Sequence, residues 1–193
     1  ALNTATGKLY RPWMTSVIDV GHRVIMAAVV HEKEPTTADS LAVLEQAILP
    51  KNSVDYPFYG KPDAVRCDNA KIYQSVEWLS AMMRLGITPD PIPRRCPSMN
   101  GIVERAFEGF KDGLFCRLAG YTDQYRALAK ANKEGAIPAP LLPGIIRKFI
   151  TTEYHLRKHT ALKTSPWESW HDNLDVADGL VIDLKEIKDA LKL

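Results

Sequence analysis

Hydrophobic positions in the first quarter of the chain follow the pattern of two strands and then a helix. Residues 13–19 and 23–31 are mostly apolar and rich in β-branched side chains, and the polar pair Gly21-His22 separates them. This pattern predicts a hairpin of two largely buried strands. Between residues 38 and 49 the apolar positions recur at helical spacing, after a pair of threonines suited to capping and before a proline. We therefore expect a helix in that segment.

The middle of the chain alternates short strands with helices. A four-residue strand at 64–67 precedes a helix expected from about 72 to 85, and an extended segment broken by prolines follows at 87–92. A further helix is expected from 101 to 118, because five apolar side chains there form one stripe. These are Val103, Phe107, Phe110, Leu114 and Leu118. The order of elements predicts an α/β fold with a mixed β-sheet flanked by helices.

The character of the sequence changes after Gly120. A polar stretch ends in a Pro-Ala-Pro linker, and a helix from about 141 to 155 precedes a basic loop and a tryptophan-rich segment at 166–170. A charged amphipathic stretch at 183–193 closes the chain. We expect three parts: a core at 1–120, a linker with core-completing helices at 121–170, and a C-terminal appendage at 171–193.

Composition narrows the class of protein. The 193 residues, 46% of them hydrophobic, are enough for one globular domain with an appendage. No apolar run approaches the roughly 18 residues of a membrane span, and residues 1–10 lack the layout of a secretory signal. The three cysteines form no C-x-x-C pair, so we expect reduced thiols and a soluble cytoplasmic protein. The net charge of +2 does not distinguish a nucleic-acid binder from any other protein, and the local basic clusters suit either phosphate binding or an ordinary solvated surface.

Two carboxylates are candidates for chemistry. Asp68 follows a short strand, at the position where ligands bind in open α/β sheets, although Asp and Asn also favour turns for local reasons. Glu104 falls in the first turn of an expected helix, where the helix dipole alone also explains an acid. Each residue therefore has a purely structural explanation. The pair, separated by 35 residues, is the feature to be explained.

The residues around this pair resemble the DDE integrase and transposase family. The resemblance rests on 63–69, on the Leu-Gly-Ile of 85–87, and above all on 97–107, Pro-Ser-Met-Asn-Gly-Ile-Val-Glu-Arg-Ala-Phe. In that family a strand-end Asp followed by Asn, and a helical Glu in an N-G-x-x-E-R context, supply the second and third metal ligands. The resemblance thus assigns these roles to Asp68 and Glu104.

Flanking segments extend the resemblance over about residues 11–170. Residues 11–19 are similar to the second-strand region of Mu-like and other DNA-segment transposases. Residues 153–170 are similar to the family segment Y-N-x-x-x-H-x-x-L-x-x-x-T-P-x-x-x-W, with His155 where Asn is usual. The resemblance implies a ribonuclease H-like mixed sheet flanked by helices, followed by a small C-terminal helical or irregular region.

The chemistry that the resemblance implies is DNA cleavage and strand transfer by in-line attack on phosphodiesters. Two divalent cations stabilise both oxygens of such a displacement, and hard carboxylate oxygens suit Mg²⁺ or Mn²⁺. The expected partners are transposon-end and target DNA, further copies of the chain on that DNA, and accessory transposition proteins, at the nucleoid of a bacterial or prophage element. The residues expected to contact DNA are Asn69, Arg95, Asn100, Arg105 and Lys111.

A DDE site needs a third acid on the first strand of its sheet. Asp19 is the one candidate in this sequence, but its context resembles the second strand, whose Asp lies outside the metal site in relatives. We therefore expect the first-strand Asp upstream of residue 1, and two half-sheets with unpaired edges in its absence. A retroelement or prophage integrase would use the same chemistry. The alternative is a non-catalytic ribonuclease H-like module that binds DNA or a partner protein in a transposition complex.

Overall fold

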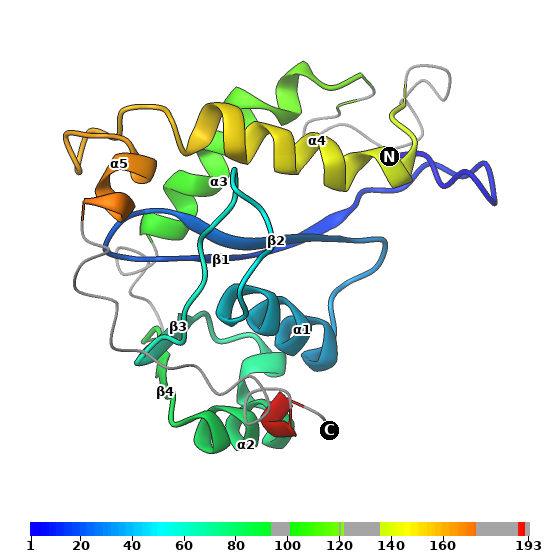
Figure 1. The fold of residues 1–193 in the computed structure, drawn as a ribbon. Helices are drawn as coiled ribbons and strands as arrows, with labels where there is room; N and C mark the ends of the chain where they lie inside the picture. Colours follow the sequence, from blue (N-terminus) through cyan, green and yellow to red (C-terminus); the bar gives the residue numbers. More distant parts are fainter. Residues whose placement is uncertain (94–100, 120, 122–135, 173–188, 192–193) are drawn as a thin grey trace.

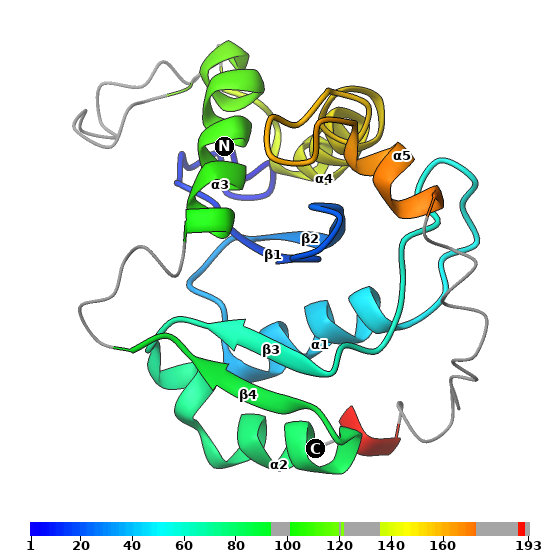
Figure 2. The ribbon, with the colours of Figure 1, turned by 90° about the vertical axis from the view of Figure 1, so that its left-hand side faces the viewer.

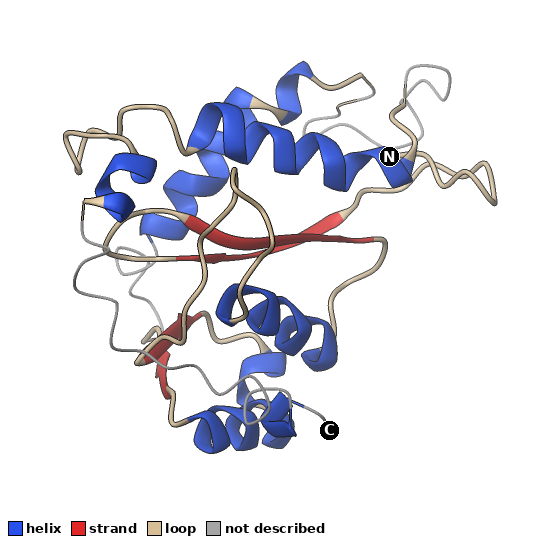
Figure 3. Cartoon of the chain, in the orientation of Figure 1, coloured by secondary structure: helices blue, strands red, loops and turns tan. Residues whose placement is uncertain are grey.

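A computed structural model of the protein describes residues 1–93, 101–119, 121, 136–172 and 189–191. The described elements form a mixed α/β fold in two tiers (Figures 1 and 3). The first tier is the hairpin of β1 (Trp13–Ile18) and β2 (Ile25–His31) with the helices that cover it. The second is built on β3 (Ala64–Cys67) and β4 (Thr88–Pro91).

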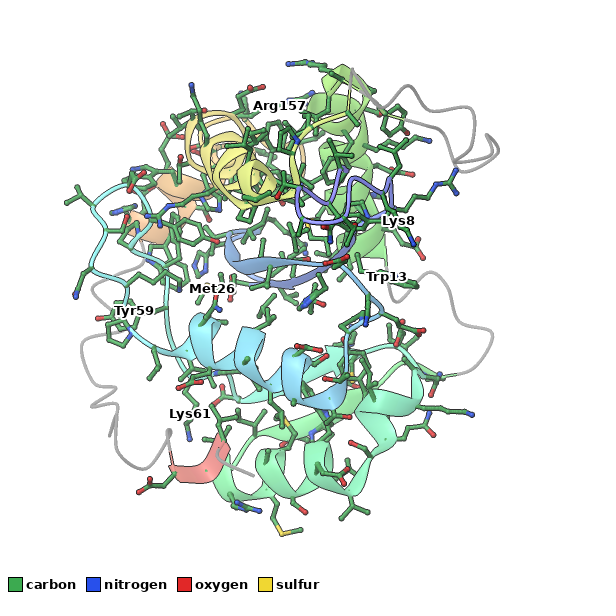
Figure 4. All side chains as sticks on the ribbon, turned by 90° about the vertical axis from the view of Figure 1, so that its right-hand side faces the viewer. Lys8, Trp13, Met26, Tyr59, Lys61 and Arg157 are labelled. Carbon is green, nitrogen blue, oxygen red and sulfur yellow. The ribbon has the colours of Figure 1, made fainter. Side chains whose placement is uncertain are left out.

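The predicted hairpin is present and is covered on both faces. Strands β1 and β2 pair antiparallel from Trp13 opposite His31 to Ile18 opposite Ile25. Four consecutive residues, 24–27, are buried. Because successive strand side chains point to opposite faces, continuous burial requires a layer on each side. Helix α1 (Thr37–Ile48) lies on one face and α3 (Gly101–Gly113) and α4 (Leu142–Phe149) on the other (Figure 2), and Met26 lies between the hairpin and α1 (Figure 4).

Helix α1 joins the two tiers because it carries apolar side chains on two faces. Val43 and Ala47 belong to the hairpin core, which also contains Phe58 and Phe110. Leu41, Leu44 and Ile48 belong to a second core with α2. The predicted threonine cap is confirmed: the Thr36 side chain accepts from the Asp39 N–H, and the Asp39 carboxylate accepts from the Thr36 N–H.

In the second tier, β3 and β4 pair parallel, with Ala64 opposite Thr88 and Cys67 opposite Pro91. The single helix expected between them is two elements, a 3₁₀ turn at Lys71–Gln74 and α2 (Val76–Leu85). The break occurs because the Ser75 side chain caps α2 by accepting from the Trp78 N–H. The helix ends at Leu85, as predicted, and Gly86, at φ +64°, is its C-terminal cap.

Helix α3 ends earlier than the sequence pattern indicated. It stops at Gly113, and a 3₁₀ turn, Phe115–Arg117, continues in place of the expected helix to residue 118. Phe110 and Leu114 of the predicted stripe are buried, and its other three members are half-buried. After the 3₁₀ turn Ala139–Leu141, α4 runs into a π-helical turn, Ile150–Tyr154, and α5 (Pro166–His171) follows.

A single ribonuclease H-like sheet is not confirmed by the described residues, whereas the expectation of two half-sheets in the absence of the first strand agrees with them. They form two separate two-stranded sheets, β1 with β2 and β3 with β4, and no described strand joins β1 to β3. Of the expected terminal stretch only 189–191 are described, as a helical turn whose Ala190 enters the second core. In the described part of the chain, no helix is both long and apolar enough to cross a membrane.

Candidate active site

Asp68 follows the last residue of β3, as predicted. Its side chain is exposed, and Oδ1 accepts a hydrogen bond from the Ala70 N–H at 2.9 Å. This bond closes a short turn and fixes the carboxylate beyond the strand end. The negative charges of Asp68 and Asp90 add to burial in raising the pKa of the neighbouring Cys67 thiol to about 11.

Two polar contacts hold the end of β3, next to Asp68, against β4. The Arg66 guanidinium on β3 reaches Asp90 on β4, with Nη2 at 2.6 Å and Nε at 2.7 Å from the same carboxylate oxygen. Asn69, which is expected to contact DNA, donates from its side-chain amide to the Ile92 carbonyl at 2.6 Å. Asn69 thus extends the β3–β4 pairing past the last ladder residues.

Glu104 lies in the first turn of α3 and is exposed. Among the described residues it makes no hydrogen bond or ion pair. The buried Phe110 belongs to the hairpin core and so holds α3 against it. In Figure 2 the carboxyl ends of β3 and β4 and the start of α3 open onto the same face of the molecule.

Asp19, the other candidate acid, has a role in the hairpin turn. Its Oδ2 accepts from the His22 N–H at 2.6 Å and lies 3.0 Å from the Nδ1 of the same residue. Asp19 also follows β1, which belongs to a different sheet from β3. Across the described residues, no three His, Cys, Asp or Glu side chains converge as a metal-binding group.

The residues expected to contact DNA are only partly described. Arg105 and Lys111 are exposed on α3. Arg95 and Asn100 lie outside the described residues. A further basic residue, Arg23, lies in the hairpin turn, where its carbonyl accepts a hydrogen bond from the Tyr154 hydroxyl at 3.2 Å.

A cavity of about 320 Å³ lies apart from the two carboxylates. Its walls are the N-terminal arm, the start of β1, the end of α3 and α4, and they are largely apolar. The lining includes Trp13, Phe107, Leu118 and Ile146, and contains neither Asp68 nor Glu104. The cavity therefore lies within the first tier, away from β3 and β4.

Comparison with known proteins assigns the family. Residues 3–120, more than half of the chain, match the TnsB C-terminal domain family. A curated relative, the transposase for transposon Tn552 of Staphylococcus aureus, is 22% identical over 169 residues, which are 86% of this chain and 34% of that protein. The chain thus spans about a third of the length of this relative. It is a transposase-related domain and belongs to the TnsB C-terminal domain family.

Solved structures support the fold. The simian T-cell lymphotropic virus intasome in complex with PP2A regulatory subunit B56 gamma matches with a TM-score of 0.59 and 20% identity, over 86% of this chain and 50% of that chain. The catalytic core domain of HTLV-2 integrase, solved in complex with magnesium in a trimeric form, matches with a TM-score of 0.53 and 18% identity, over 82% and 84%. At these identities the likeness concerns the fold alone.

Proposed function

We propose that this chain is part of a transposase catalytic core in which Asp68 and Glu104 are two of the metal-binding carboxylates. The observation that carries the proposal is their placement: Asp68 follows the end of β3 and Glu104 lies in the first turn of α3, and these two element ends lie on the same side of the molecule (Figure 2). Membership of the TnsB C-terminal domain family and the similarity to the Tn552 transposase support it. The reaction would be DNA cleavage and strand transfer.

The two carboxylates fit a hard divalent cation. Both are exposed, Glu104 is free of partners among the described residues, and Asp68 uses one oxygen for a single backbone bond. Mg²⁺ keeps waters and substrate oxygens in its shell, so a few carboxylates from converging elements are enough. When bound, a pair of such cations stabilises the attacking and leaving oxygens of a phosphodiester. The similar integrase core was solved with magnesium, and Mg²⁺ or Mn²⁺ is therefore the cofactor we propose.

Residues next to Asp68 and Glu104 hold these two carboxylates in place. The Arg66–Asp90 pair and the Asn69 amide hold the end of β3 against β4, and thereby Asp68. The packing of α3 on the hairpin core holds Glu104. Arg105 and Lys111, exposed on α3, would face the DNA backbone, where positive charge neutralises phosphates. DNA ends, target DNA and further copies of the protein are the partners that this role requires.

We further propose that the two small sheets are halves of one ribonuclease H-like sheet. Each has a strand edge without a partner among the described strands, and unpaired edges are costly when buried. A strand between β1 and β3 would join them and would carry the third acid. The engagement of Asp19 with His22 supports a source other than Asp19 for that acid.

Substitution of Glu104 tests the proposal in the complete transposase. Glu104→Gln should abolish strand transfer on transposon-end DNA while leaving DNA binding and thermal stability nearly unchanged. Glu108→Gln, an exposed acid one turn further along α3, is the matched control and should remain active. Full strand transfer by Glu104→Gln would refute the assignment.

A metal titration distinguishes the enzyme from the non-catalytic binding module. Mn²⁺ added to the complete protein should give a saturable signal in electron paramagnetic resonance that Asp68→Asn and Glu104→Gln each weaken. A module that only binds DNA or a partner protein would give the same signal with and without these substitutions. That result would favour the module.

A further inference from the structure

Helix α2 carries apolar side chains on two opposite faces. The inner face is buried in the second core and consists of Trp78, Ala81, Met82 and Leu85. On the outer face, Val76, Leu79 and Met83 expose 76%, 43% and 82% of their surface. Spacings of three and four residues place these three side chains in one line along the helix, which we call the outer stripe. A helix at the surface of a single folded chain is normally polar on this side.

The outer stripe differs from the other exposed apolar residues. Among the described residues, α2 is the only α-helix that exposes large apolar side chains. Those at Val20 and Val54 lie singly in turns, which is ordinary for a protein surface. A continuous apolar stripe contributes nothing to the fold and marks a contact with another molecule. Figure 1 shows α2 at the end of the molecule opposite α3 and α4.

Two charged side chains lie beside the outer stripe. Glu77 in the first turn of α2 and Arg84 in its last turn are exposed, and neither forms an ion pair with a described residue. A separation of two turns puts both on the same side of the stripe, about 10 Å apart along the helix. The helix dipole explains an acid at the start and a base at the end of a helix. It does not explain the apolar stripe next to them.

A second copy of α2 running antiparallel satisfies both the stripe and the charges. Across a two-fold axis, Val76 of one copy faces Met83 of the other, and Leu79 lies near the axis. The same axis places Glu77 of one copy beside Arg84 of the other. The midpoint between Val76 and Met83 and that between Glu77 and Arg84 differ by about 1.5 Å along the helix, so one register serves both pairs.

The charges also select the orientation of the pair. A parallel arrangement would place Glu77 beside Glu77 and Arg84 beside Arg84, and like charges at this spacing are destabilising. An unrelated apolar partner would account for the outer stripe, but not for the coincidence of the two midpoints. The surface is thus complementary to itself, as an isologous interface requires.

We propose that the outer stripe of α2 is a self-association surface, on which two copies of the protein pair antiparallel. A standard interface buries about 800 Å² on each partner, and one face of a ten-residue helix is smaller than that. The contact is therefore weak between free molecules and becomes populated when other contacts already hold two copies close together. This inference does not involve the metal site, so its test is independent of the tests of Asp68 and Glu104.

Site-specific cross-linking of the complete transposase tests the pairing. Leu79→Cys places a thiol near the two-fold axis, and a short bismaleimide cross-linker should then give covalent dimers well above the background of the unsubstituted protein. Val54→Cys is the matched control, because Val54 is 94% exposed and lies outside α2, and it should give only background. Equal dimer yields from the two positions would overturn the inference.

Charge reversal in the Leu79→Cys protein tests the orientation. Glu77→Arg or Arg84→Glu alone places like charges opposite each other in both symmetry-related pairs, and we expect the dimer yield to fall about fivefold. The two reversals together exchange the signs and should restore the yield, although each reversal opposes the helix dipole. Yields unchanged by the single reversals, or lowest in the double variant, would contradict antiparallel pairing.

The apolar part of the contact is tested with Met83→Gln in the same Leu79→Cys protein. This substitution keeps the length of the side chain and removes its apolar end, so we expect the dimer yield to fall about threefold. The melting temperature should stay unchanged, because the Met83 side chain is largely exposed. A lowered melting temperature with an unchanged yield would show that the outer stripe serves the fold, and would overturn the inference.

Discussion

The Nε2 atom of His155 accepts a hydrogen bond from the Ile25 N–H at 2.9 Å, across 130 residues of sequence. Both residues are fully buried, and the imidazole ring packs edge-on against Phe58 with 4.4 Å between ring centroids. This bond satisfies a backbone donor next to the hairpin turn and ties it to the π-helical turn that follows α4. One side chain thus joins the first strand pair to the C-terminal helices.

His155→Ala should destabilise the domain strongly, because it opens a cavity and leaves the Ile25 N–H without a partner. We expect a loss of about 3 kcal/mol in the free energy of unfolding, measured by urea denaturation. His155→Asn keeps a side-chain acceptor, the residue usual at this position in the family that the segment resembles, and should cost about half as much. Equal losses in the two variants would show that the bond contributes nothing beyond packing.

Burial lowers the pKa of His155 to about 3, so the folded protein keeps this ring neutral at mildly acidic pH. The unfolded chain binds a proton near the ordinary value of 6.5. The unfolded state therefore holds the extra proton between these values, and stability falls as pH drops from 6.5 toward 3. The slope should approach about 1.4 kcal/mol per pH unit from this group. Urea midpoints at pH 7.5, 6 and 5 measure it, and His155→Asn should flatten the dependence in that range.

Two glycines of α3 should respond in opposite ways to alanine. A Cβ on Gly113 would lie 2.8 Å from Cζ and 2.9 Å from Cε2 of Phe149, a buried ring packed against Phe110. Gly113→Ala should therefore cost about 1–3 kcal/mol. A Cβ on Gly109 meets nothing within 4 Å, so Gly109→Ala should stabilise by about 1 kcal/mol through helix propensity. Thermal melting of both variants measures these stability changes. If both substitutions stabilised the protein, the Phe149 ring would have moved to make room for the Cβ on residue 113, and the prediction for Gly113→Ala would be wrong.

Asn69→Ala should affect the metal site more than the fold. Loss of its bond to the Ile92 carbonyl frees the end of β3, and Asp68 with it. Residues that orient metal ligands typically contribute at least about tenfold to metal affinity or activity, so we expect Mn²⁺ binding and strand transfer by the complete transposase to fall by about that factor. Gln46→Ala, on the exposed side of α1, is the control. Weaker DNA binding with unchanged Mn²⁺ affinity would instead assign Asn69 a direct contact with DNA.

Much of the local structure follows from sequence because its causes are local. Apolar runs, and the polar, glycine and proline residues that separate them, predicted the hairpin, α1 with its cap, both short strands and the end of α2. The end of α3 was missed because apolar spacing continues to residue 118, whereas the helix stops at Gly113, which lies against the Phe149 ring of α4. The break before α2 was missed because Ser75 acts as a cap only once the chain has turned.

By itself the sequence determined the alternation of strands and helices, the candidate acids Asp68 and Glu104, and the motif that led to the transposase family. These depend on residue types and short spacings, which a sequence states directly. Only the tertiary structure revealed that Asn69 holds β3 to β4 and that the Tyr154 hydroxyl donates to the Arg23 carbonyl. Such contacts join residues far apart in the chain. Their existence depends on how the helices and sheets pack, which no local pattern specifies.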